Sequence, residues 1–85
     1  MNEHYNHNGD KTIDKILSGR SDNNIAFNDL RNALIKMGFK ERINGDHFIY
    51  KKARIPERIN IQPDGNMAKG YQVRQVREIV LKYEI

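Results

Sequence analysis

The spacing of apolar residues changes at Gly38, and this change constrains the fold more than any other feature of the sequence. Before Gly38 apolar residues recur at helical spacing, and after it they alternate with polar residues, which is typical of a strand. The chain has only 85 residues, so it can bury one thin core. We therefore expect a single domain in which helices and strands share that core, and a multidomain enzyme is excluded.

Three segments have the spacing of amphipathic helices. The first is expected to begin at Asp10 and to end before Gly19. The second is expected to take Asn28 as its N-cap and to stop at Gly38. The third includes residues 73–83 and has the most regular spacing of the three.

The first nine residues show no apolar periodicity and are rich in Asn, which predicts a disordered tail before a domain of residues 10–85. His4 and His7 lie three residues apart in this tail, but two histidines without a third ligand do not make a metal site. The chain has no Cys, which excludes disulfides, thiolate catalysis and cysteine-ligated metals. We predict neither a metal nor another cofactor.

Asn44 and Gly45 stand between two alternating segments and predict a β-hairpin, because Asn-Gly suits the positive φ angles of a type I′ turn. A third strand is expected at residues 57–62, after a turn that contains Pro56. The predicted fold class is α+β, with a three-stranded antiparallel sheet and helices packed on one face.

The hairpin predicts a sheet with two chemically different faces. With Asn44 and Gly45 as the turn, Arg42 would lie directly opposite His47. Alternation then gives one apolar face under the helices, with Glu41 as its misfit, and one open polar face. The residues expected to bind phosphate are Arg42, Lys51 and Arg58, with Lys40 and Lys52 as helpers.

Positive charge is concentrated in the middle of the chain. Residues 36–77 hold ten cations and four anions, whereas residues 1–35 hold four and five. This local excess favours a polyanionic partner such as a nucleic acid or an acidic protein, although a solvated face is the simpler alternative. No apolar run exceeds three residues, so we expect no membrane segment and a cytoplasmic location.

His47 is the one histidine inside the predicted fold. An isolated histidine on an exposed strand is most often a plain surface residue. Among phosphate-binding cations, however, a neutral imidazole can act as a general base, and Arg42 opposite it would favour the neutral form.

Residues 45–50, which begin Gly45-Asp46-His47, together with residues 61–65 and 71–79, resemble the HicA family of toxins. The resemblance runs from about Lys11 to the C-terminus. HicA proteins are small prokaryotic ribonucleases of type II toxin–antitoxin pairs, and a HicB antitoxin neutralises them. The resemblance implies a fold similar to the double-stranded RNA-binding domain, cleavage of mRNA, and inhibition of translation in a stress response.

The catalytic histidine of the family's Gly-Ser-His-His motif corresponds to His47. Asp46 replaces the serine and Phe48 replaces the second histidine, so the role of that second histidine is not carried over. The stretch before Asn24 is longer than in compact members, which implies an extra N-terminal helix.

RNA supplies its own nucleophile, the 2′-OH, so a proton-transfer group and phosphate-binding cations suffice and no metal is required in principle. Together with this chemistry, the resemblance implies a metal-independent endoribonuclease with His47 as general acid or base, mRNA as substrate and a HicB-like partner. A non-catalytic RNA-binding module, or an inactive toxin that acts only in protein interaction, are the alternatives.

Overall fold

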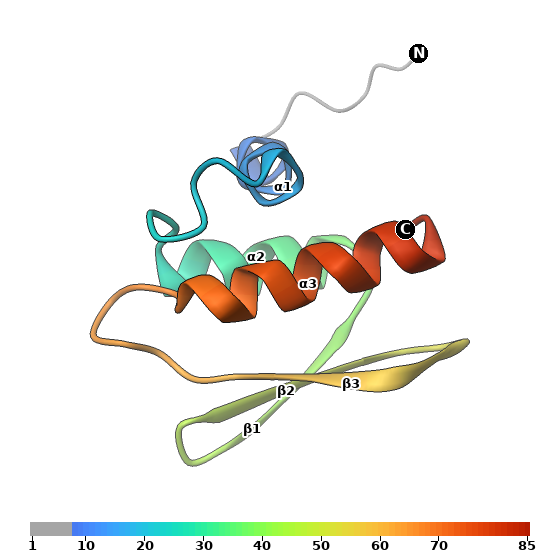
Figure 1. Ribbon diagram of the computed structural model, residues 1–85. Coiled ribbons are helices and arrows are strands. Elements are labelled where there is room, and N and C mark those ends of the chain that lie inside the picture. Colours follow the sequence, from blue (N-terminus) through green and yellow to red (C-terminus); the bar gives the residue numbers. More distant parts are fainter. Residues whose placement is uncertain (1–7) are drawn as a thin grey trace.

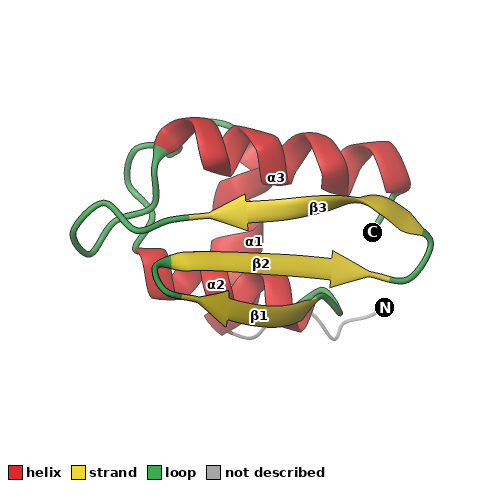
Figure 2. Ribbon diagram, turned by 90° about the horizontal axis from the view of Figure 1, so that it is seen from below, coloured by secondary structure: helices red, strands yellow, loops and turns green. Residues whose placement is uncertain are grey.

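The computed structural model describes residues 8–85 and shows three layers: a sheet, a pair of helices on the sheet, and one further helix on that pair (Figure 1). The helices are α1 (Asn8–Ser18), α2 (Phe27–Lys36) and α3 (Gly70–Tyr83), and the strands are β1 (Lys40–Asn44), β2 (His47–Lys52) and β3 (Ile55–Ile61). The strands are antiparallel in the order β1-β2-β3, and no described element covers the lower sheet face (Figure 2). The predicted α+β class and three-stranded antiparallel sheet are confirmed.

The core lies between the sheet and the pair α2 and α3. Its fully buried side chains include Leu30, Leu34, Tyr50, Ile59, Ile61, Val73 and Val76. Helix α1 adds Ile16, which is 1% exposed, from the other side of the helix pair. The expected tail falls outside the described residues, apart from Asn8 and Gly9, which belong to α1.

Helix α2 begins before the predicted cap. Ala26 is its N-cap residue and has no side-chain cap bond, whereas Asn28 lies inside the helix and accepts from Arg31 at 3.0 Å. The N–H of Phe27 donates instead to the carbonyl oxygen of Asn66 at 2.9 Å. The expected Asn28 cap is therefore wrong, because a loop far along the chain satisfies this helix end.

Strand β3 begins two residues earlier than predicted and includes Pro56. Because β3 is an edge strand, the missing N–H of Pro56 costs no central ladder bond. The turn before β3 is formed by Ala53 and Arg54, and Arg54 has a φ of +73°. The expected Pro56-containing turn is thus displaced toward β2.

Arg77 fastens α1 to the rest of the fold. From α3 its guanidinium donates to both carboxylate oxygens of Asp22, at 2.8 and 3.1 Å, and to the carbonyl oxygen of Ile16 at 3.0 Å. The hydrogen bond from Arg77 lowers the pKa of Asp22 below its usual value. One side chain therefore holds both the end of α1 and the turn after it.

Replacing Arg77 by Ala should lower the free energy of unfolding by about 2 kcal/mol, because it leaves a largely buried carboxylate and a carbonyl without donors. Urea unfolding followed by circular dichroism measures this, and amide exchange should quicken first in α1. Arg74→Ala, which removes an exposed arginine from the same helix, is the matched control. Equal losses in the two variants would contradict the role of Arg77.

Glu57 joins the start of β3 to the last turn of α3. Its carboxylate accepts from Lys82 Nζ at 2.8 Å and from the Tyr83 hydroxyl at 2.6 Å. The hydrogen bonds from Lys82 and Tyr83 lower the pKa of Glu57 from 4.5 to about 2. The ionised form is therefore favoured in the folded state.

A carboxylate with a lowered folded pKa stabilises the fold above its unfolded pKa and loses this effect as the pH falls through the folded value. We expect wild type to be more stable than Glu57→Gln at neutral pH, and the difference to shrink between pH 4.5 and about 2. Unfolding measured across this range tests the point. A difference that persists unchanged at the acid end would refute it.

Candidate nucleic-acid interface

The turn of the β1–β2 hairpin lies one residue later than predicted. Asn44 pairs with His47, so Gly45 and Asp46 form the two-residue turn. Gly45 has a φ of +64° while Asp46 has no positive φ, a pattern typical of a type II′ rather than a type I′ turn. Arg42 consequently lies opposite Ile49, and its predicted position opposite His47 is wrong.

This displacement changes which residues pair across the two strands, but it does not change the sheet face on which each side chain lies. Moving the turn by one residue slides the two strands by two residues relative to each other, and the strand pleat repeats every two residues. His47 therefore still lies on the open face and is exposed. Two rows cross this face: Arg42, Ile49 and Asn60, and Asn44, His47 and Gln62. In a third row Lys40 pairs with Lys51, and Arg58 lies next to this pair where the register of β2 and β3 shifts.

Four of the five predicted phosphate-binding residues share the open face with His47. These four cations, all exposed, are Lys40, Arg42, Lys51 and Arg58. Lys52 points to the helix side, where its Nζ donates to the carbonyl oxygen of Met37 at 2.8 Å and lies 6.0 Å from the Phe39 ring centre. Its amino group thus satisfies the C-terminal end of α2, on the opposite sheet face from the other four cations.

The ring of His47 is bordered by two amide side chains. Its Nδ1 lies 3.4 Å from Asn60 Oδ1, and Gln62 Nε2 lies 3.0 Å from the ring Nε2 and 3.3 Å from Nδ1. Alternation within the predicted strand of residues 57–62 puts Asn60 and Gln62 on the face of Arg58, but it does not link either side chain to the imidazole. The link depends on the pairing of β2 with β3.

Gln62 is itself held by Gln72 in the first turn of α3. With its side-chain amide oriented to satisfy both partners, Gln72 donates to the Gln62 carbonyl oxygen and accepts from the Gln62 N–H, both at 3.1 Å. Gln72 is 2% exposed, so this is a buried and fully partnered amide. The helix layer therefore fixes the backbone beside the His47 ring.

Glu41, the misfit of the sequence pattern, is partnered on the helix side. Arg31 on α2 binds both of its oxygens at 2.9 and 3.1 Å, and the Tyr50 hydroxyl donates to it at 2.6 Å. The hydrogen bond from Arg31 lowers the pKa of Glu41, while burial and the bond to Glu41 raise that of Tyr50. The negative charge of Glu41 is thus neutralised away from the open face.

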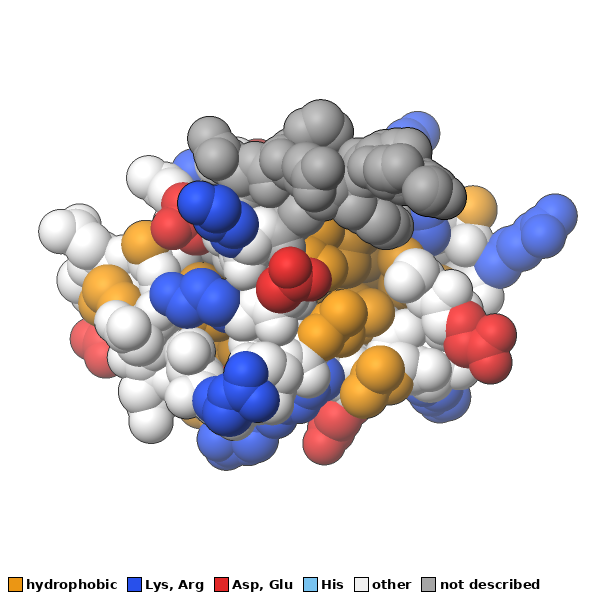
Figure 3. Space-filling model, turned by 90° about the horizontal axis from the view of Figure 1, so that it is seen from above, with side chains coloured by type: hydrophobic (Ala, Val, Ile, Leu, Met, Phe, Trp, Pro, Cys, Tyr) orange, Lys and Arg blue, Asp and Glu red, His pale blue; other side chains and the backbone are white. Residues whose placement is uncertain are grey.

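The open-face cations have no carboxylate partner among residues 11–85. The salt bridges in that range are Arg31–Glu41, Arg77–Asp22 and Lys82–Glu57, and none involves an open-face cation. On the opposite side of the molecule, the visible Lys and Arg side chains alternate with Asp and Glu around an apolar centre (Figure 3). An imidazole beside unpaired cations is suited to binding a phosphodiester and transferring a proton near it.

Residues 8–85 contain no cluster of three His, Cys, Asp or Glu side chains that could hold a metal ion. His4 and His7 lie outside the described residues. In the same part of the chain, no helix is long and apolar enough to cross a membrane.

Comparison with known proteins gives no match: no family model fits the chain, and no curated protein or solved structure is significantly similar to it. The side chains on the open sheet face are therefore the basis for assigning a function.

The amide contacts predict the tautomer of His47. Because Gln62 Nε2 is a donor and lies nearest the ring Nε2, the neutral ring should carry its proton on Nδ1, facing the Asn60 oxygen. Long-range proton–nitrogen correlation spectra at alkaline pH measure this directly. A predominant Nε2–H form would contradict the arrangement, and Asn60→Ala should reduce the preference for Nδ1.

Proposed function

We propose that this protein is an endoribonuclease toxin resembling the HicA family, which cleaves mRNA at the open sheet face and inhibits translation. The observation that carries the proposal is one exposed imidazole on the same sheet face as four exposed cations that have no carboxylate partner among residues 11–85. Its partners would be mRNA and a HicB-like antitoxin protein, in the cytoplasm of a prokaryote.

In this proposal His47 acts as general base toward the 2′-OH or as general acid toward the leaving 5′-oxygen. Such a group contributes about 10²–10⁴ in rate. Arg42, in the row next to His47, binds a non-bridging phosphate oxygen and stabilises the charge that develops there. One histidine does not perform both transfers at once, so water supplies the second, and no metal takes part.

The element order is consistent with the resemblance. Helix α2, the three strands and α3 would form the part similar to the double-stranded RNA-binding domain, and α1 would be the extra N-terminal helix of a single HicA-like domain, residues 10–85. Asp46 and Phe48 remain the departures from the family motif. Phe48 lies on the helix side, edge-on to the Phe27 ring at 4.9 Å and under Arg31 at 4.7 Å. In this proposal, His47 is therefore the only histidine that transfers a proton.

Induction of the wild-type chain in a bacterium should stop growth and produce new transcript ends, whereas His47→Ala should do neither. With purified protein, the cleavage rate should fall by about 10²–10⁴ in His47→Ala and should be unchanged by a chelator. Because His47 is exposed, the variant should unfold at the same urea concentration as wild type.

Each of the other outcomes would indicate a different function for this chain. Full cleavage by a folded His47→Ala variant would contradict the assignment of His47. RNA binding without cleavage by the wild type would support a non-catalytic RNA-binding module. Neither binding nor cleavage would favour a chain that acts only in protein interaction.

A further inference from the structure

A row of like charges crosses the sheet at the end away from His47. Lys40 on β1 pairs directly with Lys51 on β2. Arg58 on β3 follows the irregular stretch where the register of β2 and β3 shifts, and it directly precedes Ile59, the partner of Tyr50. Like charges directly opposite each other destabilise a sheet. All three side chains are exposed, and no salt bridge among residues 11–85 compensates their charge. A bound anion would remove this repulsion.

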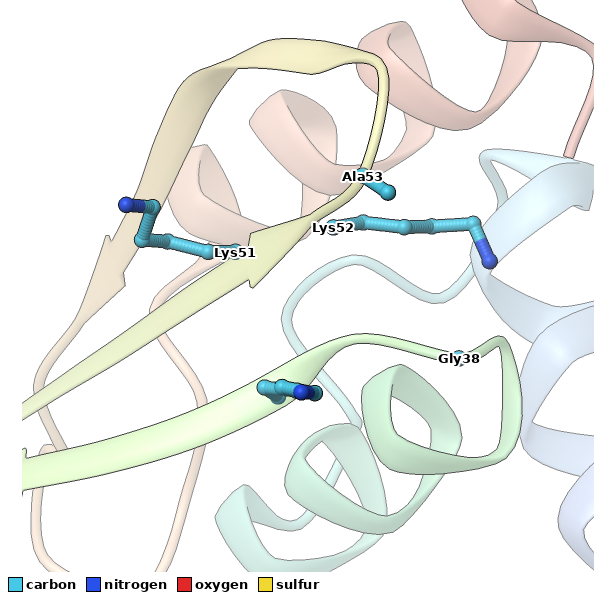
Figure 4. A pocket seen from close by; sticks show the side chains of 5 residues that line it. Gly38, Lys51, Lys52 and Ala53 are labelled. Carbon is cyan, nitrogen blue, oxygen red and sulfur yellow. The ribbon is translucent and has the colours of Figure 1, made fainter.

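A hollow adjoins this row where β1 and β2 separate (Figure 4). Its volume is about 370 Å³, and it is lined by Gly38, Lys40, Lys51, Lys52 and Ala53. Gly38 has a φ of +96° and no side chain, so the backbone there lies close to the amino group of Lys52. The hollow is within the size range of sites for small organic groups and has room for more than a single ion.

Lys51, the middle member of this row, and His47 lie on the same strand, so the distance between them follows from the strand geometry. Lys51 follows His47 by four residues on β2, which is about 13 Å at the usual rise of a strand. A stacked nucleic-acid strand advances about 3.4 Å per phosphate, so this length corresponds to about four nucleotides, or fewer in a more extended strand. Arg42 lies in the row between them.

We propose that Lys40, Lys51 and Arg58, with the adjoining hollow, form a second phosphate subsite that holds an RNA strand lying lengthwise along the sheet. This inference rests on the proposed function and assigns the substrate as a single strand that extends several nucleotides from the phosphate at His47. A linear polyanion fits better than a compact acidic protein surface, because the cations follow one another in rows along the strand direction on the imidazole face.

The test uses RNA oligonucleotides that are 2′-O-methylated, so that they bind without being cut. Fluorescence anisotropy gives their affinity for the full chain over a range of lengths and salt concentrations. For wild type, affinity should rise with length up to about five nucleotides. In a variant with Lys40→Gln, Lys51→Gln and Arg58→Gln, this gain should disappear, and the slope of log affinity against log salt should lessen by about 2, since each phosphate contact contributes about 0.7.

The matched control removes the same charge from exposed helix positions: Lys11→Gln, Lys36→Gln and Arg74→Gln. Its salt slope should change by less than half as much, and that of His47→Ala should not change. The sheet variant should unfold at the same temperature as wild type or higher, because repulsion across the row is relieved. This measurement separates a lost subsite from a lost fold.

Three results would overturn the subsite. If RNA binds and the sheet variant matches the control, the row is wrong although the proposed function stands. If wild type binds no RNA at low salt, both fail together. If polyglutamate displaces the RNA as well as an RNA competitor of equal charge, the row is a general surface for acidic proteins.

Discussion

The pairing of Asn44 with His47 across the hairpin determines which side chains share the open face of the sheet. One face of this sheet is closed by α2 and α3, where Tyr50, Ile59 and Ile61 are fully buried. A slip by a single residue would bring charged side chains into that core and apolar ones into water. The buried face thus holds the imidazole and its neighbouring cations in solvent.

On the helix side of the sheet, the polar and charged side chains have hydrogen-bond partners within the fold. The two faces of the sheet therefore differ in charge, since the open face carries the cations. Glu41 is bound by Arg31 and Tyr50, and the Lys52 amino group is bound by a backbone carbonyl oxygen at the end of α2. Gln72 is buried with both ends of its amide satisfied. Since an unpartnered buried polar group costs about 1–3 kcal/mol, these contacts stabilise the folded state. The open-face cations form no salt bridge within residues 11–85.

Local pattern was sufficient for the fold class and for the division of the sheet into faces. Alternation around Gly45 placed His47 and Lys51 on one face and Tyr50 on the other, and these positions survive because the register error is two residues. The same alternation places Lys52 on the face of Tyr50, which is the helix side. The strand pattern therefore did not support counting Lys52 among the phosphate-binding residues.

The exact register was not accessible from local pattern. With Arg42 opposite His47, as the sequence predicted, Glu41 would lie opposite Phe48. In the structure Glu41 lies opposite Tyr50, and its carboxylate accepts hydrogen bonds from the Tyr50 hydroxyl and from Arg31. Asn-Gly turn chemistry favours a turn at Asn44 and Gly45. The contacts of Glu41 with the helix layer are found with the turn at Gly45 and Asp46 instead. The Asn28 cap failed for the same reason, since its role is taken by a distant loop.

The central claim is that this face cuts RNA through the substrate's own 2′-OH, with the protein supplying proton transfer and phosphate binding. The most direct measurement compares two oligonucleotides incubated with the purified protein and a chelator: an RNA that is cleaved at a mapped site, and the same RNA with a single 2′-deoxy nucleotide at that site. The account predicts that the first is cleaved and the second is intact at that position. Equal cleavage of both would contradict it.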